Sequence, residues 1–144
     1  MAVAGFGMLM LNFVFLAYYF FHQAVLAAVG ILGPPSVLER TRWFPFLAHF
    51  AYLAIIGAVS WLVYRSKWKT LYKAICLPVP VAAVSAAIGI FFYAWPVAVY
   101  ALNAFFYAGI LHYFTRAQKP WIYYYAVILV GLVLMFLLLT GGDI

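Results

Sequence analysis

Long apolar runs separated by short polar breaks dominate the pattern of the chain. Each run reaches about the 20 residues that a helix needs to cross the hydrocarbon core of a bilayer. The breaks include a Gly33-Pro34-Pro35 motif, which cannot continue a helix. The pattern predicts an all-α integral membrane protein, a bundle of five transmembrane helices in a single domain that covers residues 1–144. The predicted spans are about Phe6 to Leu32, Phe44 to Tyr64, Ile75 to Tyr93, Pro96 to Phe114 and Trp121 to Thr140.

The number of spans depends on the stretch from Ala74 to Phe114, which holds 41 residues and no charged side chain. A single helix of that length would be far longer than a bilayer is thick. Tyr93 and Trp95 followed by Pro96 predict a tight turn, because proline ends a helix and aromatic side chains favour the membrane interface. We therefore favour five spans, with four as the alternative if this stretch crosses only once.

Two features of the later spans bear on packing. Ala82, Ala86 and Gly89 lie on one side of the third predicted span, and small residues at this spacing allow a neighbouring helix to approach closely. We predict that this side packs against another helix. The fifth span is almost purely aliphatic, and we expect much of its surface to contact lipid.

The composition agrees with a membrane location. Of the 144 residues, 71% are hydrophobic and only 7% are charged, a surface that no soluble domain of this size could solvate. The first apolar run has no basic residue before it and no small-residue cleavage site, so we interpret it as a span and not as a signal peptide. We expect a multi-pass protein of a bacterial or a mitochondrial inner membrane.

The positive charge lies in the short breaks beside the apolar runs. The chain has eight Lys and Arg against two acidic residues, a formal net charge of +6. Six of the eight follow the second and fourth spans, and two, Arg40 and Arg42, follow the first. Because inner loops are richer in Lys and Arg, this predicts that the N-terminus lies inside. We expect contact with anionic lipid headgroups, not nucleic acid, from Arg65, Lys67, Lys69, Lys73, Arg116 and Lys119.

The break after the second span has a pattern of its own. Trp68, Leu71, Tyr72 and Ile75 recur at helical spacing among the lysines. Such a pattern is typical of a short amphipathic helix that lies on a membrane surface, and we predict one here.

Polar side chains share one side of three predicted spans. On the first span, Asn12, Tyr18, Tyr19, His22 and Gln23 form one broad face at about 100° per residue. His22 lies too deep to reach the interface, so we predict that it is buried within the protein or within a complex that it helps form, in hydrogen-bonding reach of a polar group from another helix. The three faces either form interhelical hydrogen bonds or line a cavity for a small ligand, a lipid or a quinone. The candidate ligand-binding residues are His22, Gln23, Tyr19, His49, Tyr52, Tyr100, Asn103 and Tyr107.

The motifs of common enzymes are missing from the sequence. There is no GxSxG, no HExxH and no pair of carboxylates, and no predicted span contains the Asp or Glu that proton-driven transport usually needs. Heme b would need two histidines at similar depth, which only His22 and His49 could supply, because His112 is predicted near the opposite surface. We therefore predict no catalytic residues, no metal site and no cofactor, with heme b as the alternative.

The pattern favours a non-catalytic accessory or structural subunit of a larger membrane complex, because the loops are short and no chemistry is evident. A small oligomeric transporter or channel with a polar midplane cavity is the first alternative. A lipid-, quinone- or heme-binding redox subunit is the second. The expected partners are membrane lipids, especially anionic ones, together with other membrane subunits or further copies of the chain.

Overall fold

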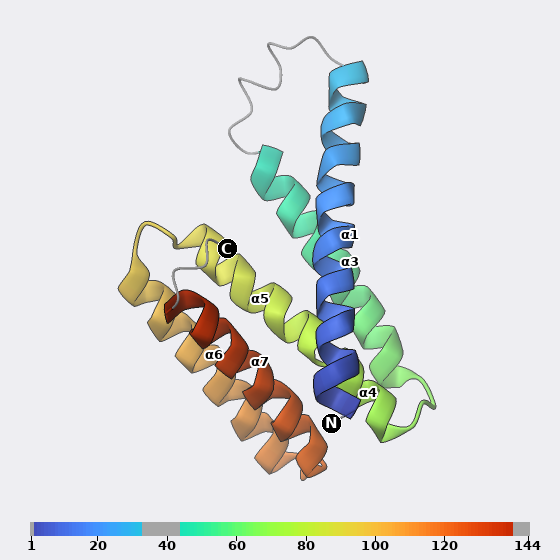
Figure 1. The fold of residues 1–144 in the computed structure, drawn as a ribbon, viewed down its shortest axis with the longest axis vertical. Coiled ribbons are helices and arrows are strands. Elements are labelled where there is room, and N and C mark those ends of the chain that lie inside the picture. Colours follow the sequence, from blue (N-terminus) through green and yellow to red (C-terminus); the bar gives the residue numbers. More distant parts are fainter. Residues whose placement is uncertain (1, 33–43, 140–144) are drawn as a thin grey trace.

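The computed structural model describes residues 2–32 and 44–139, and every regular element in this part of the chain is a helix (Figure 1). The prediction of an all-α fold is therefore confirmed. The break at Gly33-Pro34-Pro35, Arg40 and Arg42 lie outside the described residues. The helices are α1 (Ala2–Leu32), α3 (Phe44–Arg65), α4 (Thr70–Cys76), α5 (Pro78–Phe91), α6 (Pro96–Arg116) and α7 (Trp121–Leu139).

Within residues 2–32 and 44–139, four helical stretches are long and apolar enough to cross a membrane. A shorter apolar stretch, Trp121–Phe136, forms most of α7. The uncharged run that decided the predicted count is divided as expected, because α5 ends at Phe91, a turn follows, and Pro96 opens α6 where its missing N–H costs least. These lengths are consistent with a membrane protein. The four stretches are Ala2–Ala28, Leu47–Arg65, Thr70–Phe91 and Pro96–Arg116.

The predicted amphipathic surface helix after α3 is wrong. Residues 66–69 are not helical, and α4 begins only at Thr70. It then continues almost without interruption into α5, because Leu77 between them keeps helical angles (φ −61°, ψ −38°) and Pro78 opens α5 at its first turn. Ala74 and Leu77 are buried in the core, so this segment packs into the bundle and continues into α5.

The helices run alternately in opposite directions, with α5 between two groups (Figure 1). α1 and α3 pack on one side of α5, whereas α6 and α7 pack on the other. The N-terminus, the α3–α4 connection and the α6–α7 connection lie at one end of the bundle, and the α5–α6 turn lies at the opposite end. From the N-terminal end, α1 and α3 diverge from the other group, which leaves the two groups less closely packed toward the far end.

The best-packed part of the core lies where α4, α5 and α7 meet. Ala74, Ala82, Ala126, Val127 and Val130 all have 0% of their surface exposed. The aliphatic helix α7 thus has one face that is buried in the bundle, formed by Ala126, Val127 and Val130. Its opposite face exposes Ile128, Leu132 and Met135, as expected of a helix that contacts lipid.

Glycine and alanine positions show where helices approach one another most closely. A Cβ atom added to Gly7 of α1 would lie 3.2 Å from Cγ of Pro78, so these two helices are in tight contact. A Cβ on Gly89 would meet nothing within 4 Å. The predicted small-residue seam is therefore wrong at Gly89, although Ala82 is fully buried and Ala86 lies beside a pocket.

Candidate functional site

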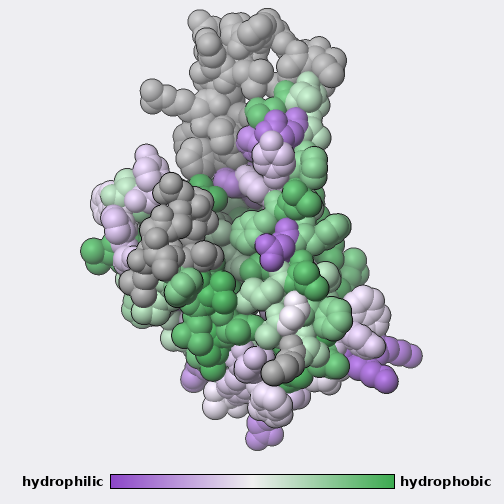
Figure 2. All heavy atoms as spheres, in the orientation of Figure 1, coloured by the Kyte–Doolittle hydropathy of each residue, from purple (hydrophilic) through white to green (hydrophobic). Residues whose placement is uncertain are grey.

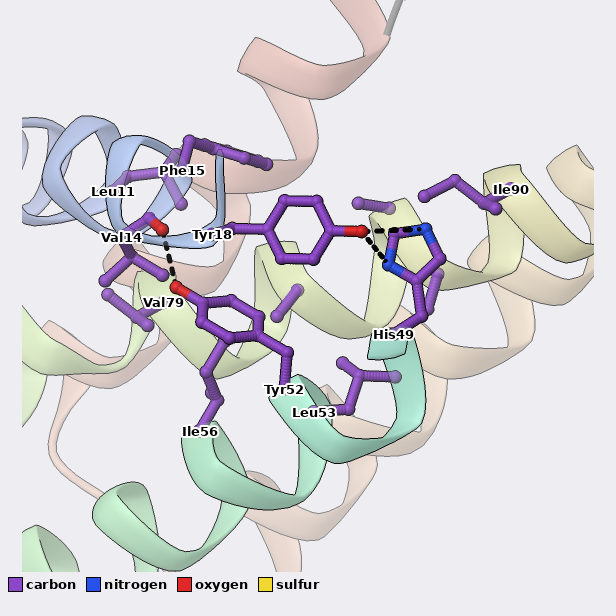
Figure 3. A pocket seen from close by; sticks show the side chains of 13 residues that line it. Leu11, Val14, Phe15, Tyr18, His49, Tyr52, Leu53, Ile56, Val79 and Ile90 are labelled. Atoms are coloured by element: carbon purple, nitrogen blue, oxygen red, sulfur yellow. Dashed lines mark hydrogen bonds between the residues drawn. The ribbon is translucent and has the colours of Figure 1, made fainter. Parts of the chain in front are cut away.

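A pocket lies between α1, α3 and α5, with about 60 Å³ of internal space, and it is partly open to the surface (Figure 3). Its floor on α5 is formed mainly by Ala83, Ala86 and Ala87. The space exists because these short side chains face α1 and α3 without filling the gap. Aliphatic side chains from all three helices complete most of the lining, among them Leu11, Val14, Leu53, Ile56, Val79 and Ile90.

Tyr18 and His49 form the polar centre of the pocket. The Tyr18 hydroxyl points at the imidazole of His49, hydrogen-bonding Nδ1 and lying 3.2 Å from Nε2, and the two rings stack with centroids 4.9 Å apart (Figure 3). A neutral imidazole has one N–H and one bare nitrogen. Both ring nitrogens therefore lie within hydrogen-bonding distance of the same hydroxyl, and the pair brings one O–H and one N–H donor to the pocket.

Tyr52 positions the two helices that hold this pair. Its hydroxyl donates to the carbonyl oxygen of Val14 across the α1–α3 interface at 2.6 Å. Its ring also contacts the rings of Tyr18 and Phe21, with centroids 4.9 and 5.6 Å away. Since its proton is already used, Tyr52 acts as a link between α1 and α3 and offers no free donor.

Only one side of the predicted polar face on α1 points into the bundle. His22 is half-buried and its ring lies 6.2 Å from that of Tyr18, but no hydrogen bond joins His22 to another of the described residues. The predicted hydrogen bond to another helix is made by Tyr18, one turn earlier. Tyr19 and Gln23 are exposed and lie outside the pocket.

The polar residues of α6 do not join those of α1 and α3, because α6 packs on the other side of α5. Tyr107 accepts a hydrogen bond from Ser85 of α5 at 3.2 Å. Asn103 donates to the Val99 carbonyl of its own helix at 3.0 Å, and its buried Oδ1 has no partner within the described part of the chain. Tyr100 is exposed. Of the eight candidate residues, His49 and Tyr52 line the pocket.

Two residues important for these contacts were not among the candidates. Tyr18 was placed on the polar face but not in the site, although its spacing of four and seven residues from Val14 and Leu11 matches the side of α1 that packs. Ser85 could have been found as the one hydroxyl among the alanines of α5. In both cases the useful signal was the position of a polar residue among small or aliphatic ones.

The position of the Tyr18 ring argues against a heme between His22 and His49. Tyr18 contacts both His22 and His49, with ring centroids 6.2 and 4.9 Å away. A heme ligated by both histidines would have to displace this ring. Among the described residues, no group of three His, Cys, Asp or Glu side chains is placed to hold a metal ion.

A second candidate surface is the basic end of the bundle, formed by the α3–α4 and α6–α7 connections. The Tyr64 and Tyr123 rings, 6.5 Å apart, bring the two connections together. Lys73 is turned inward, where Nζ donates to the Tyr64 carbonyl at 2.8 Å, and the Arg65 guanidinium lies 4.6 Å from the Trp61 ring. Hydrophilic side chains gather at this end in Figure 2. The cations most available to a headgroup are Lys67, Lys69, Arg116 and Lys119, all exposed.

The second of these connections has a defined conformation. Gln118 adopts a left-handed backbone conformation (φ 45°). The Lys119 N–H donates to the Phe114 carbonyl at 3.0 Å, and the Gln118 N–H donates to the Thr115 carbonyl at 3.2 Å. These bonds form the Schellman motif that commonly ends a helix. The motif holds Arg116 and Lys119 at the same end of the bundle.

Comparison with known proteins gives no relative from which a function could be transferred. No protein-family model matches the chain. No curated protein and no solved structure matches it either. The arguments about function therefore rest on the geometry of the chain itself.

Proposed function

We propose that the protein binds the hydrocarbon chain of a neutral lipid in the pocket between α1, α3 and α5. The observation that supports this most directly is a mainly aliphatic lining interrupted by the Tyr18–His49 pair. A hydrocarbon chain would restore the dispersion contacts that an empty pocket loses. The O–H or the N–H of the pair would bind a hydroxyl, ester or carbonyl oxygen of the lipid. Within the described chain no charged side chain lines the pocket, so an anionic group would have no counterpart there.

The size of the pocket favours a lipid chain over a ring system. Its 60 Å³ is less than half of the roughly 150 Å³ of a cavity that accommodates benzene. A short length of chain fits this space, while the rest of the lipid stays in the bilayer. A quinone ring or a heme would need a larger opening between α1 and α3.

Photocrosslinking of the purified protein in bilayers tests this proposal. The probe is a monoacylglycerol with a diazirine in its acyl chain, and we expect labelling of α1, α3 and α5 around Ala86. Ala86→Leu fills the pocket and should abolish this labelling, whereas Ala104→Leu, the same exchange at an exposed position of α6, should not change it. Tyr18→Phe/His49→Phe removes both groups that can bond the lipid oxygen, a hydrogen bond of about 1 kcal/mol, and should weaken binding roughly fivefold. Labelling spread evenly over all helices, or equal in the two leucine variants, would contradict the proposal.

We also propose that the chain crosses the membrane five times with its N-terminus inside. The alternating directions of the helices and the position of both basic connections at one end support this orientation. In a Cys76→Ser background, Lys67→Cys and Lys119→Cys should react with an impermeant maleimide only from inside, and Ala94→Cys only from outside. Labelling of Ala94→Cys from inside would mean that α4–α5 does not cross.

Replacing Lys67, Lys69, Arg116 and Lys119 by Gln should reduce retention of anionic lipid in native mass spectrometry, since each contributes about 1 kcal/mol near a charged surface.

An accessory subunit of a larger membrane complex is the second candidate function. It is favoured by the surface of α3 and α6, since only 11% of the residues in each of these spans are buried within the bundle. A transport path through the bundle has less support, because the polar residues of α6 lie on the other side of α5 from the pocket.

A further inference from the structure

The outer side of α1 has polar side chains at regular spacing. Leu9, Asn12, Leu16, Tyr19 and Gln23 are all exposed, and their separations alternate between three and four residues. We call this surface the amide stripe. Hydrophilic side chains interrupt the apolar surface over α1 in Figure 2. The stripe points away from the residues of α1 that line the pocket, so it is independent of the proposed lipid site.

The two carboxamides of the stripe lie inside the apolar stretch of α1 that is long enough to cross a membrane, Ala2–Ala28. α1 has 31 residues, and Asn12 and Gln23 lie about 15 and 14 Å from its two ends at a rise of about 1.5 Å per residue. Asn12 Nδ2 donates to the Met8 carbonyl of its own helix at 2.9 Å. No hydrogen bond joins Gln23, or Oδ1 of Asn12, to another described residue. Hydrocarbon offers neither donor nor acceptor, so amides at this depth need partners from another helix.

We infer that the amide stripe packs against the same stripe of a second copy of this chain, as a parallel pair of α1 helices. Copies inserted in the same direction place equal residues at equal depth, so Asn12 meets Asn12 and Gln23 meets Gln23 across a two-fold axis. A carboxamide has both a donor and an acceptor group and is therefore its own complement. Alternating separations of three and four residues are the spacing of a seam between two supercoiled helices.

Two further features favour a second copy over other occupants. Gly5, the preceding position of the same repeat, has open space around a built Cβ, so the backbones can approach closely there. The stripe has no charged side chain, so nothing in it selects a partner of opposite charge. A lipid chain covers leucine well but leaves both amides unpaired.

Cysteine crosslinking in bilayers locates the interface. In a Cys76→Ser background, Leu16→Cys should form a disulfide-linked dimer under mild oxidation, because residues on a two-fold seam face their own copies. Met10→Cys is the matched control, since Met10 is also exposed on α1 but lies on another side of the helix. Crosslinking of both variants to the same extent would overturn the proposed interface.

Energy transfer between labelled copies in liposomes measures the contribution of the amides. Asn12→Leu/Gln23→Leu should weaken dimerisation by roughly tenfold or more, and Met10→Leu should leave it unchanged. The fold should survive, because both amides are exposed in the single chain, and circular dichroism together with the lipid crosslinking described above checks this. A monomeric wild-type protein, or an Asn12→Leu/Gln23→Leu variant that dimerises like the wild type, would refute the inference while leaving the lipid site untouched.

Discussion

The two sides of α5 contain similar residue types but organise them differently. Toward α1 and α3, Ala83, Ala86 and Ala87 face a partly open pocket. Toward α6 and α7, the Ser85 hydroxyl bonds Tyr107, whose ring lies 3.4 Å from the position of a Cβ on Gly131. An aromatic ring packed against a glycine fills the space on one side, whereas Tyr18 and Tyr52 on the other side line the pocket over the alanines without filling it. Small residues on a membrane helix therefore indicate close packing only when the facing helix supplies a complementary side chain.

The largest effect is expected on protein stability when a buried alanine and a pocket alanine of α5 are each replaced by leucine. Ala82 has 0% of its surface exposed, so Ala82→Leu must displace packed neighbours and should destabilise the protein by about 1–3 kcal/mol. Ala86→Leu extends into the pocket and should change stability by less than about 0.5 kcal/mol, as surface-like substitutions do. Thermal unfolding of the two variants in the same detergent measures both effects. Equal losses would show that the pocket is as tightly packed as the core.

A smaller effect is expected at the glycines. Gly7→Ala brings a methyl group to 3.2 Å from Pro78, and the resulting strain should outweigh the gain in helix propensity, with a net loss of up to about 1 kcal/mol. Gly89→Ala meets nothing within 4 Å and should be neutral or stabilising by up to about 1 kcal/mol. The order of the two unfolding temperatures checks the prediction. A less stable Gly89→Ala variant would restore the seam that the sequence suggested at that position.

The elements were predictable because each break in the sequence has a local cause. Proline at position 96 opens α6, and the 41-residue uncharged run that contains it is too long for one helix across a bilayer. Which side of α1 packs was not predictable in this way. The polar residues of α1 do not identify its buried face, because Tyr18 points into the bundle whereas Asn12 and Gln23 are exposed. The buried residues Val3, Gly7 and Leu11 are set by shape, through the contact of Gly7 with Pro78.

The candidate site was predicted only in part for the same reason. Polar residues on three helices suggested one shared interior, and His49 and Tyr52 do line the pocket. The α6 candidates lie away from the pocket because α5 separates α6 from α1 and α3. No local pattern in the sequence specifies this arrangement of the helices. The exposed amides of α1 were expected in the interior because their depth requires hydrogen-bond partners, and the sequence does not tell whether those partners belong to the same chain or to another one.

The smallest expected effect concerns the energetic coupling between hydrogen-bonded partners on the two sides of α5. Ser85 and Tyr107 are enclosed by packed side chains, so Ser85→Ala leaves the Tyr107 hydroxyl with no nearby substitute. A double-mutant cycle of Ser85→Ala and Tyr107→Phe should give a coupling of about 0.6 kcal/mol, the average for such bonds between membrane helices. The corresponding cycle of Tyr18→Phe and His49→Phe should give less, because each remaining group can still bond a lipid oxygen or water that enters the pocket. Unfolding free energies of the six variants and the wild type provide both couplings. A larger coupling for Tyr18 and His49 would mean that their bond is sealed from the surroundings, and the pocket would then be a packing defect with no access for a ligand.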